Sequence, residues 1–128
     1  RLNYVVKQRE GFRPFAPIIT EEEYQRFFEA SEPSPYMSRV MKTRTKFIPS
    51  ATHVDGTCRV QTVSQKQNRK FHKLITLIGN QSSIPVVLNT SFNLKDETIT
   101  LTPKQAIERY LKSEIDFLVI NNFLIKKR

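Results

Sequence analysis

The sequence Val87-Leu88-Asn89-Thr90-Ser91-Phe92-Asn93 carries an apolar run directly into polar side chains, with no glycine or proline between them. Residues 84–88 are predicted as a strand buried on both faces, and such strands present ligand-binding groups at their carboxyl ends. If the extended conformation continues, Asn89, Ser91 and Asn93 point to the same side. Their amides and hydroxyl suit a neutral amide or phosphate oxygens better than a metal ion. The same residue types also bend chains into turns, so the motif alone leaves both a ligand site and a turn open.

Strand-like and helix-like segments follow one another along the chain without an internal repeat. This pattern predicts the α/β (α+β) class, a mixed twisted sheet with about three helices packed on it. Pro14 and Pro17 should confine the strand around them to the margin of the sheet, because proline cannot donate to a strand ladder.

Helices are predicted over residues 20–30, opened by a capping box of Thr20 and Glu23, and over residues 69–79, capped by Asn68. A third helix is predicted from residue 102 onward, opened by a capping box of Thr102 and Gln105, with a core face of Ala106, Ile107, Tyr110 and Leu111. Strands are predicted over residues 4–7, 15–19, 36–43, 57–63, 84–88, 97–101, 117–120 and 123–125, and the last two form a hairpin around an Asn121-Asn122 turn.

The length of 128 residues predicts one domain, residues 1–128, and the net charge of +9 predicts an anionic partner or an acidic neighbouring surface. The single Cys58 excludes an internal disulfide and, with only two histidines, argues against a structural zinc site. This cysteine usage fits a reducing, cytoplasmic setting. No run of about twenty apolar residues is present, so we expect no membrane association. The chain opens with Arg1 rather than methionine, which indicates a fragment of a longer protein.

Three cations, Lys7, Arg9 and Arg13, lie within one predicted strand and the turn after it. Lys7 and Arg9 fall on the same side at strand period, and the three charges repel one another unless an anion joins them. A phosphate there would gain charge-assisted hydrogen bonds of about 1.5–3 kcal/mol each. The alternative is that each side chain extends separately into water.

A histidine, a carboxylate and an arginine surround the tight turn at Asp55-Gly56. The set formed by His53, Asp55 and Arg59 permits proton transfer or ligand binding, although a histidine before such a turn often satisfies backbone groups only. The glycine-rich motifs of common nucleotide-binding folds are absent from the sequence, and no general nucleophile stands out.

Three strings together resemble the C-terminal domain of O-carbamoyltransferases of the nodulation-protein-U type. They are Lys7-Gln8-Arg9-Glu10-Gly11-Phe12-Arg13-Pro14-Phe15-Ala16-Pro17, Thr52-His53-Val54-Asp55-Gly56-Thr57-Cys58-Arg59-Val60-Gln61-Thr62-Val63 and Leu88-Asn89-Thr90-Ser91-Phe92-Asn93. The resemblance implies a YrdC-like α/β fold that binds carbamoyl phosphate and ATP, with magnesium, and forms carbamoyl adenylate. It also implies an N-terminal ASKHA-like domain of the same polypeptide. That domain would hold the metal of the transfer step and pass the carbamoyl group to a hydroxyl of a natural product or saccharide.

The resemblance assigns roles to individual residues of this chain. Lys7, Arg13 and Arg59 match the catalytic cations that hold the phosphate of carbamoyl phosphate, with Arg9 assisting. Asn89 and Ser91 match the pair that contacts the carbamoyl and phosphate oxygens. The site also includes residues whose roles stay open, namely His53 and Asn93.

Two positions depart from the family pattern. A small residue is expected where this chain has Cys58, and a Gly-Glu-Pro sequence is expected where it has Asp96-Glu97-Thr98. The first change is compatible with burial, and the second is expected to alter a loop.

A different class of function is a non-catalytic binding module that recruits RNA or another polyanion through its charge. Such binding would weaken steeply with salt and tolerate single substitutions, whereas a pocket for a small anion would not tolerate them. Few aromatic residues lie among the basic ones to stack on bases, so we do not expect a nucleic acid partner.

Overall fold

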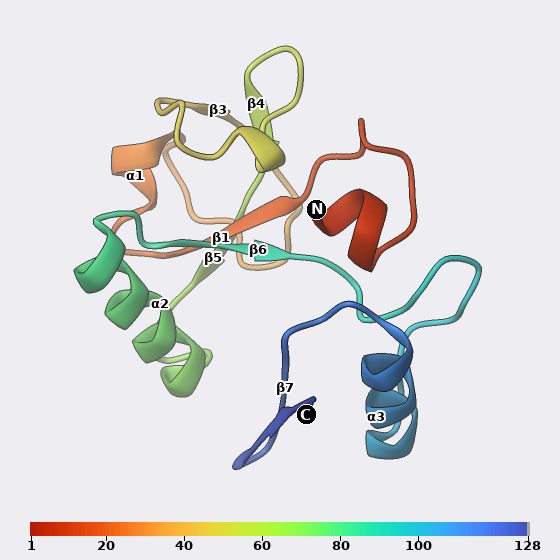
Figure 1. The fold of residues 1–128 in the computed structure, drawn as a ribbon. Helices are drawn as coiled ribbons and strands as arrows, with labels where there is room; N and C mark the ends of the chain where they lie inside the picture. The colour runs from red at the N-terminus through yellow and green to blue at the C-terminus, as the bar shows by residue number, and fades with distance from the viewer. Residues whose placement is uncertain (128) are drawn as a thin grey trace. The chain divides into compact units, whose positions relative to one another are not determined.

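The computed structural model describes residues 1–127, which form three small sheets and three α-helices (Figure 1). The residues divide into two compact units. We call Pro14–Thr90 the central unit, and Arg1–Arg13 together with the chain from Ser91 onward the terminal unit. The α+β class is confirmed, but the strands lie in three sheets rather than in a single mixed sheet. That both units belong to one domain stays a prediction.

Strand β1, Ala16–Thr20, is the middle strand of the first sheet in the central unit. It pairs in parallel with β5, Gln61–Val63, and antiparallel with β6, Val86–Asn89. All five residues of β1 are buried. Such burial requires cover on both faces of the sheet.

The two faces of β1 contact different cores of the central unit. Ile18 packs with Val63 and Ile75 against helix α2, Arg69–Ser82. Ile19, which alternates to the opposite face, belongs to a larger cluster that contains Phe28 and Met41. This second core also holds Cys58, whose thiol is fully buried and whose pKa is raised by that burial.

The order of the first sheet corrects two predictions. Pro17 was expected at a margin, yet it is fully buried in the middle strand. Proline is tolerated there because β5 pairs only from Ile18 onward, so Pro17 faces a paired neighbour, Leu88, on one side alone. Conversely, β6 was expected to be buried on both faces, but it is an edge strand and Leu88 is 40% exposed.

A second sheet of the central unit contains β2, Phe28–Glu29, β3, Val40–Thr43, and β4, Thr57–Arg59, all antiparallel. One continuous strand was predicted over residues 57–63. Instead the chain leaves β4 at Val60 and joins the first sheet as β5, so the two halves of the predicted strand belong to different sheets.

The terminal unit contains helix α3, Pro103–Lys112, and the hairpin of β7, Phe117–Ile120, and β8, Phe123–Lys126. Tyr110 lies fully buried in its core. The Tyr110 hydroxyl donates to the backbone oxygen of Asp116 and accepts a bond from the backbone N–H of Lys127, which ties the helix to both strands at the open end of the hairpin. The predicted hairpin turn at Asn121-Asn122 is confirmed, and Asn121 adopts a φ of 53°.

Three local predictions are wrong. Residues 4–7 form no strand, because Leu2–Val6 winds into a short π-helical segment, η1. The capping box expected at Thr20 is not formed, since Thr20 ends β1 and α1 spans only Tyr24–Phe27. Residues 97–101 form no strand either, because Thr100 bonds the backbone oxygen of Phe92 through its N–H and its hydroxyl.

Two further elements complete the description. The short 3₁₀ helix η2 spans Pro49–Ala51 in the central unit. Within residues 1–127, no helix has both the length and the apolar character needed to cross a membrane.

Helix α2 begins at the cap that the sequence predicts. The Asn68 side chain accepts a bond from the backbone N–H of Phe71 at 3.1 Å, which satisfies one of the unpaired donors of the first turn. At the other end Gly79 is required, because a Cβ there would lie 2.7 Å from the side chain of Pro85.

We expect Asn68→Ala to lower the free energy of unfolding by about 1 kcal/mol, because it removes the capping acceptor. Denaturant unfolding followed by circular dichroism measures the change. Asn80→Ala, an exposed substitution inside the same helix, is the control and should be neutral or slightly stabilising. An equal loss in both variants would show that the cap contributes nothing.

Candidate functional site

A basic pocket of about 240 Å³ lies in the terminal unit. It carries four cations and two carboxylates, a net charge of +2 from 4 − 2. Cations that repel one another in a small volume favour the binding of an anion. The lining residues are Lys7, Arg9, Glu10, Arg13, Ser91, Asn93, Leu94, Lys95 and Asp96.

The Lys7 ammonium binds the segment that forms one wall of this pocket. It donates to the backbone oxygens of Ser91 and Asn93 and to Asn93 Oδ1, each at 2.7 Å. An ammonium has three hydrogens, so these three acceptors match all of its donors. Ser91 Oγ also donates to Asn93 Oδ1, at 2.6 Å. Lys7 thus holds the Ser91–Asn93 turn in place and supplies positive charge beneath it.

The environment of Lys7 makes its charged form costly. The side chain is buried, and this burial lowers the pKa of its ammonium, with the nearby charge of Arg9 lowering it further. A bound anion would offset both effects, because an opposite charge favours the ammonium form. The electrostatics of Lys7 therefore favour occupation of the pocket by a negatively charged group.

The two arginines of the pocket are oriented by short-range partners. Arg9 Nε donates to Asn3 Oδ1 at 2.8 Å, and Arg13 Nε lies 3.0 Å from Glu10 Oε2. The Arg13–Glu10 pair is half exposed, and such pairs stabilise a protein by only about 0–1 kcal/mol. The Arg13 guanidinium can therefore leave Glu10 for an entering anion at little cost.

A second network holds the loop after Asn93. Glu97 Oε2 accepts from the backbone N–H of Leu94 at 3.2 Å and from Arg109 Nε at 2.7 Å. The Asn93 amide donates to the backbone oxygen of Glu97 at 2.9 Å, and Arg109 also donates to Thr100 Oγ1. The hydrogen bonds to Leu94 and Arg109 lower the pKa of the Glu97 carboxyl.

The departure from the family pattern at Asp96 has a structural meaning. Asp96 adopts a φ of 61°, the left-handed region that glycine enters most easily. The resemblance expects glycine at this position, and aspartate is among the residues that tolerate the conformation best otherwise. The loop thus keeps its turn despite the substitution.

The turn at Asp55-Gly56 satisfies its own polar groups. Asp55 Oδ1 accepts from the backbone N–H and the hydroxyl of Thr57, and His53 Nδ1 lies 2.9 Å from the same hydroxyl. The bonds from Thr57 lower the pKa of the Asp55 carboxyl. These contacts favour the turn interpretation of His53; its predicted role in ligand binding stays a prediction.

The structure brings five of the eight predicted site residues together, namely Lys7, Arg9, Arg13, Ser91 and Asn93. The other three, His53, Arg59 and Asn89, belong to the central unit. Arg59 is exposed at the end of β4, and the Asn89 amide donates to Gln61 Oε1 at 2.8 Å. Their contribution to the same site stays a prediction.

The predicted alternation of Asn89, Ser91 and Asn93 is wrong. Strand β6 ends at Asn89, and the boundary between the two units follows Thr90. Lys7 and Arg9 also do not alternate along a strand, because they follow η1. The cations share a pocket through tertiary folding rather than through strand period.

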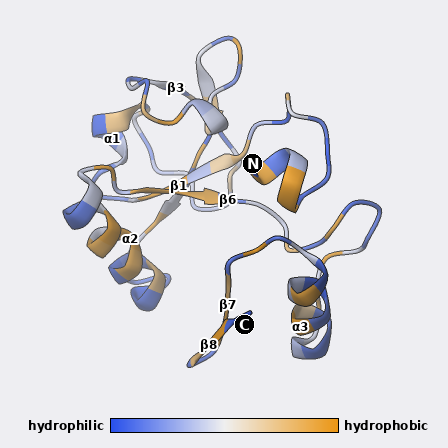
Figure 2. Cartoon of the chain, viewed as in Figure 1, coloured by the Kyte–Doolittle hydropathy of each residue, from blue (hydrophilic) through white to orange (hydrophobic). Residues whose placement is uncertain are grey.

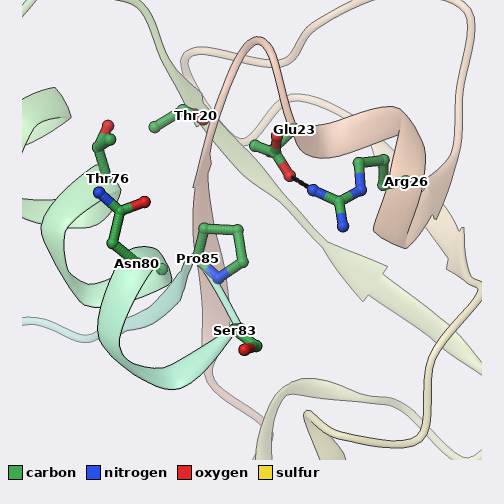
Figure 3. Close-up of a pocket in the computed structure, with 8 residues that line it drawn as sticks. Thr20, Glu23, Arg26, Thr76, Asn80, Ser83 and Pro85 are labelled. Atoms are coloured by element: carbon green, nitrogen blue, oxygen red, sulfur yellow. Dashed lines mark hydrogen bonds and ion pairs between the residues drawn. The ribbon is translucent and has the colours of Figure 1, made fainter.

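The central unit has a pocket of about 300 Å³ of different character (Figure 3). Glu23 and Arg26 form an ion pair on its wall, so their charges cancel. The remaining lining is neutral and includes Thr76, Asn80 and Ser83. This pocket has none of the net charge of the terminal one. Within residues 1–127, no three His, Cys, Asp or Glu side chains form a group able to hold a metal ion.

Lys95, Glu97 and Arg109 were missed from the sequence. Ile107 and Leu111 were expected in the core of α3, and no position was predicted for Arg109. The structure instead buries Arg109 and leaves Ile107 40% and Leu111 63% exposed. The signal was available, because Arg109 lies three residues after the buried Ala106, and a buried arginine requires a partner.

The chain matches a family model described as Carbamoyltransferase C-terminus over residues 1–127. The chain belongs to this carbamoyltransferase C-terminus family. Nodulation protein NolNO of Sinorhizobium fredii is 40% identical over 134 residues, which cover 100% of this chain and 20% of that protein. Nodulation protein NolO of Bradyrhizobium diazoefficiens is 41% identical over 134 residues, 100% of this chain and 24% of that protein.

A third relative has a name that states a reaction. The 3'-hydroxymethylcephem-O-carbamoyltransferase of Amycolatopsis lactamdurans is 38% identical over 98 residues, 76% of this chain and 19% of that protein. The chain spans about a fifth to a quarter of the length of these curated relatives. The resemblance to the family that the three motifs predict is thereby confirmed.

We expect Lys7→Met to destabilise the protein by roughly 2–3 kcal/mol, because it leaves three acceptors of the Ser91–Asn93 turn without their donor. Denaturant unfolding measures the loss, and hydrogen exchange should show faster opening of residues 91–97. Lys95→Met, which removes an exposed ammonium from the same pocket, is the control and should change stability by less than about 0.5 kcal/mol. Similar losses in the two variants would contradict the positioning role of Lys7.

The lowered pKa of Glu97 predicts a defined pH dependence. A carboxyl whose pKa is lower in the folded than in the unfolded protein stabilises the fold above its unfolded pKa of about 4.3. This stabilisation is lost as the pH falls through the folded pKa. We therefore expect Glu97→Gln to lower the urea midpoint at pH 7 and to match wild type at acidic pH. The control is Glu108→Gln on the exposed side of α3; a Glu97→Gln deficit that is constant with pH would exclude a charge effect.

Proposed function

We propose that this chain is the carbamoyl-adenylate-forming part of a carbamoyltransferase. It binds carbamoyl phosphate and ATP and, with consumption of one water molecule, forms carbamoyl adenylate, phosphate and pyrophosphate. An N-terminal ASKHA-like domain of the same polypeptide then transfers the carbamoyl group to a hydroxyl of a natural product or saccharide. The observation that carries this proposal is the basic pocket, in which Lys7, Arg9, Arg13 and Lys95 converge on two polar side chains, Ser91 and Asn93.

The volume of the pocket supports a small anion. At about 240 Å³ it lies just below the usual range of roughly 300–1,000 Å³ for small-molecule sites. Carbamoyl phosphate suits this size, whereas ATP would extend beyond it and expose its nucleoside part to other surfaces. The phosphate end would bind the cations, and the neutral carbamoyl end suits hydroxyl and amide groups.

The chemistry assigned to these residues is positioning and charge stabilisation. Arg9 and Arg13 neutralise the negative charge that develops on the departing phosphate and pyrophosphate. Lys7 acts mainly through its charge and through the turn that it holds, because its donors already bind Ser91 and Asn93. ATP is a co-substrate that arrives with magnesium. Any metal of the transfer step is assigned to the part of the polypeptide outside this chain.

The family supports the carbamoyl group as the transferred unit. The name of the Amycolatopsis relative describes an O-carbamoyltransferase, which is consistent with a hydroxyl acceptor here. The nodulation relatives match the whole of this chain, so the matched region includes both sequence segments that form the pocket. The acceptor itself is not specified by any of these residues.

We expect Arg13→Ala to weaken the binding of carbamoyl phosphate by roughly tenfold or more, because it removes a charge-assisted hydrogen bond of about 1.5–3 kcal/mol. Arg59→Ala should weaken it as well if Arg59 reaches the same anion. Isothermal titration calorimetry at fixed salt measures both.

The control is Arg69→Ala, which removes one exposed charge from the first turn of α2 in the central unit. A pocket predicts no change in this variant, whereas a polyanion-binding surface predicts similar losses for every arginine and a steep salt dependence. Equal binding by wild type and by the double variant Arg13→Ala, Arg59→Ala would refute the assigned pocket.

A further inference from the structure

The hairpin of β7 and β8 is apolar on both faces. Cross-strand partners share a face, and the register pairs Leu118 with Ile125 on the inner one. Leu118 is buried with Ala106 and Tyr110 of α3, and Ile125 packs against the same cluster. This inner face accounts for the attachment of the hairpin to the terminal unit.

The outer face contains Phe117, Val119, Leu124 and Lys126, because Phe117 pairs with Lys126 and Val119 with Leu124. The three apolar residues are 52%, 68% and 68% exposed. Among these four residues the one polar group, the Lys126 ammonium, lies 5.9 Å from the centre of the Phe117 ring at one end of the hairpin. Figure 2 shows hydrophobic residues along both strands.

An antiparallel sheet with one face in water normally alternates apolar and polar residues. The outer face departs from that rule at three of its four positions. Helix α3 already supports the inner face of the hairpin, so it does not account for the apolar outer face. The exposure of Phe117, Val119 and Leu124 therefore indicates that a second apolar layer covers them.

The size of the face decides which kind of partner fits. Stable interfaces between separate proteins use about 20–30 residues on each side, far more than the three apolar residues here. A small apolar face binds usefully when its partner is tethered, because a tether raises the effective concentration to about the millimolar range. The relatives carry between about three-quarters and four-fifths of their length outside the matched region, so a tethered partner is available in this family.

We propose that the outer face of the hairpin, Phe117, Val119 and Leu124, docks against the part of the polypeptide that lies outside residues 1–128. The proposal does not depend on the anion that fills the basic pocket, because Lys7, Arg13 and the hairpin residues share no side-chain contact among those described here. It assigns to the hairpin the joint between this chain and the remainder of a longer enzyme.

Thiol labelling of the full-length polypeptide tests the proposal. Val119→Cys is a small change at an exposed strand position, and the native Cys58 is buried and should stay unlabelled. The matched control is Val54→Cys, because Val54 is fully exposed in the central unit. We expect labelling at position 119 to be at least tenfold slower than at position 54. Equal rates would overturn the proposal, because the face would then be open to water.

A second measurement identifies what covers the face. A photoreactive diazirine analogue of leucine replaces Leu124 in the full-length polypeptide, and mass spectrometry locates the cross-linked peptides. Cross-links to residues outside 1–128 within one molecule support the proposal. Cross-links to residues 14–90, or links between two molecules that increase with protein concentration, overturn it in favour of the central unit or of a second copy. Carbamoyl phosphate binding measured on the same samples shows separately whether the basic pocket is intact.

Discussion

The buried ammonium of Lys7 is the constraint on which the terminal unit depends. A buried charge is costly unless hydrogen-bonded, and Lys7 finds its acceptors on Ser91 and Asn93, more than eighty positions later in the chain. These bonds connect the two sequence segments that make up the unit. They also present the Ser91 and Asn93 side chains at the wall of the pocket. One interaction thus serves both the fold and the predicted site.

The pocket wall is supported from a second direction by the ion pair of Glu97 and Arg109. Arg109 is buried on α3, so the position of the helix determines where Glu97 lies, and Glu97 in turn fixes the loop that follows Asn93. An arginine and a lysine therefore act on the two ends of one short segment. This arrangement pre-organises the wall before any ligand arrives, which reduces the ordering cost of binding.

Two helix caps and the hairpin turn were predicted best, although the capping box at Thr20 was wrong. The Asn68 cap, the Thr102 cap of α3 and the Asn121-Asn122 hairpin turn all depend on residues a few positions apart, and the structure confirms them. Strand order was not predicted, because it depends on which distant segments pair. Because proline lacks a backbone N–H, Pro17 was predicted at the margin of the sheet. It is tolerated in the middle strand because β5 pairs with β1 only from Ile18 onward, which no local sequence pattern specifies.

The sequence by itself determined the family, the helix caps, the hairpin and the identity of the cations, because these follow from motifs and from short-range hydrogen bonds. Only the tertiary structure decided which polar groups meet. The tertiary structure bonds Lys7 to Ser91 and Asn93. The Asn89 amide bonds Gln61, and the buried Arg109 bonds Glu97. The physical reason is that a buried donor takes the acceptor that packing brings within about 3 Å, and sequence spacing does not encode that distance.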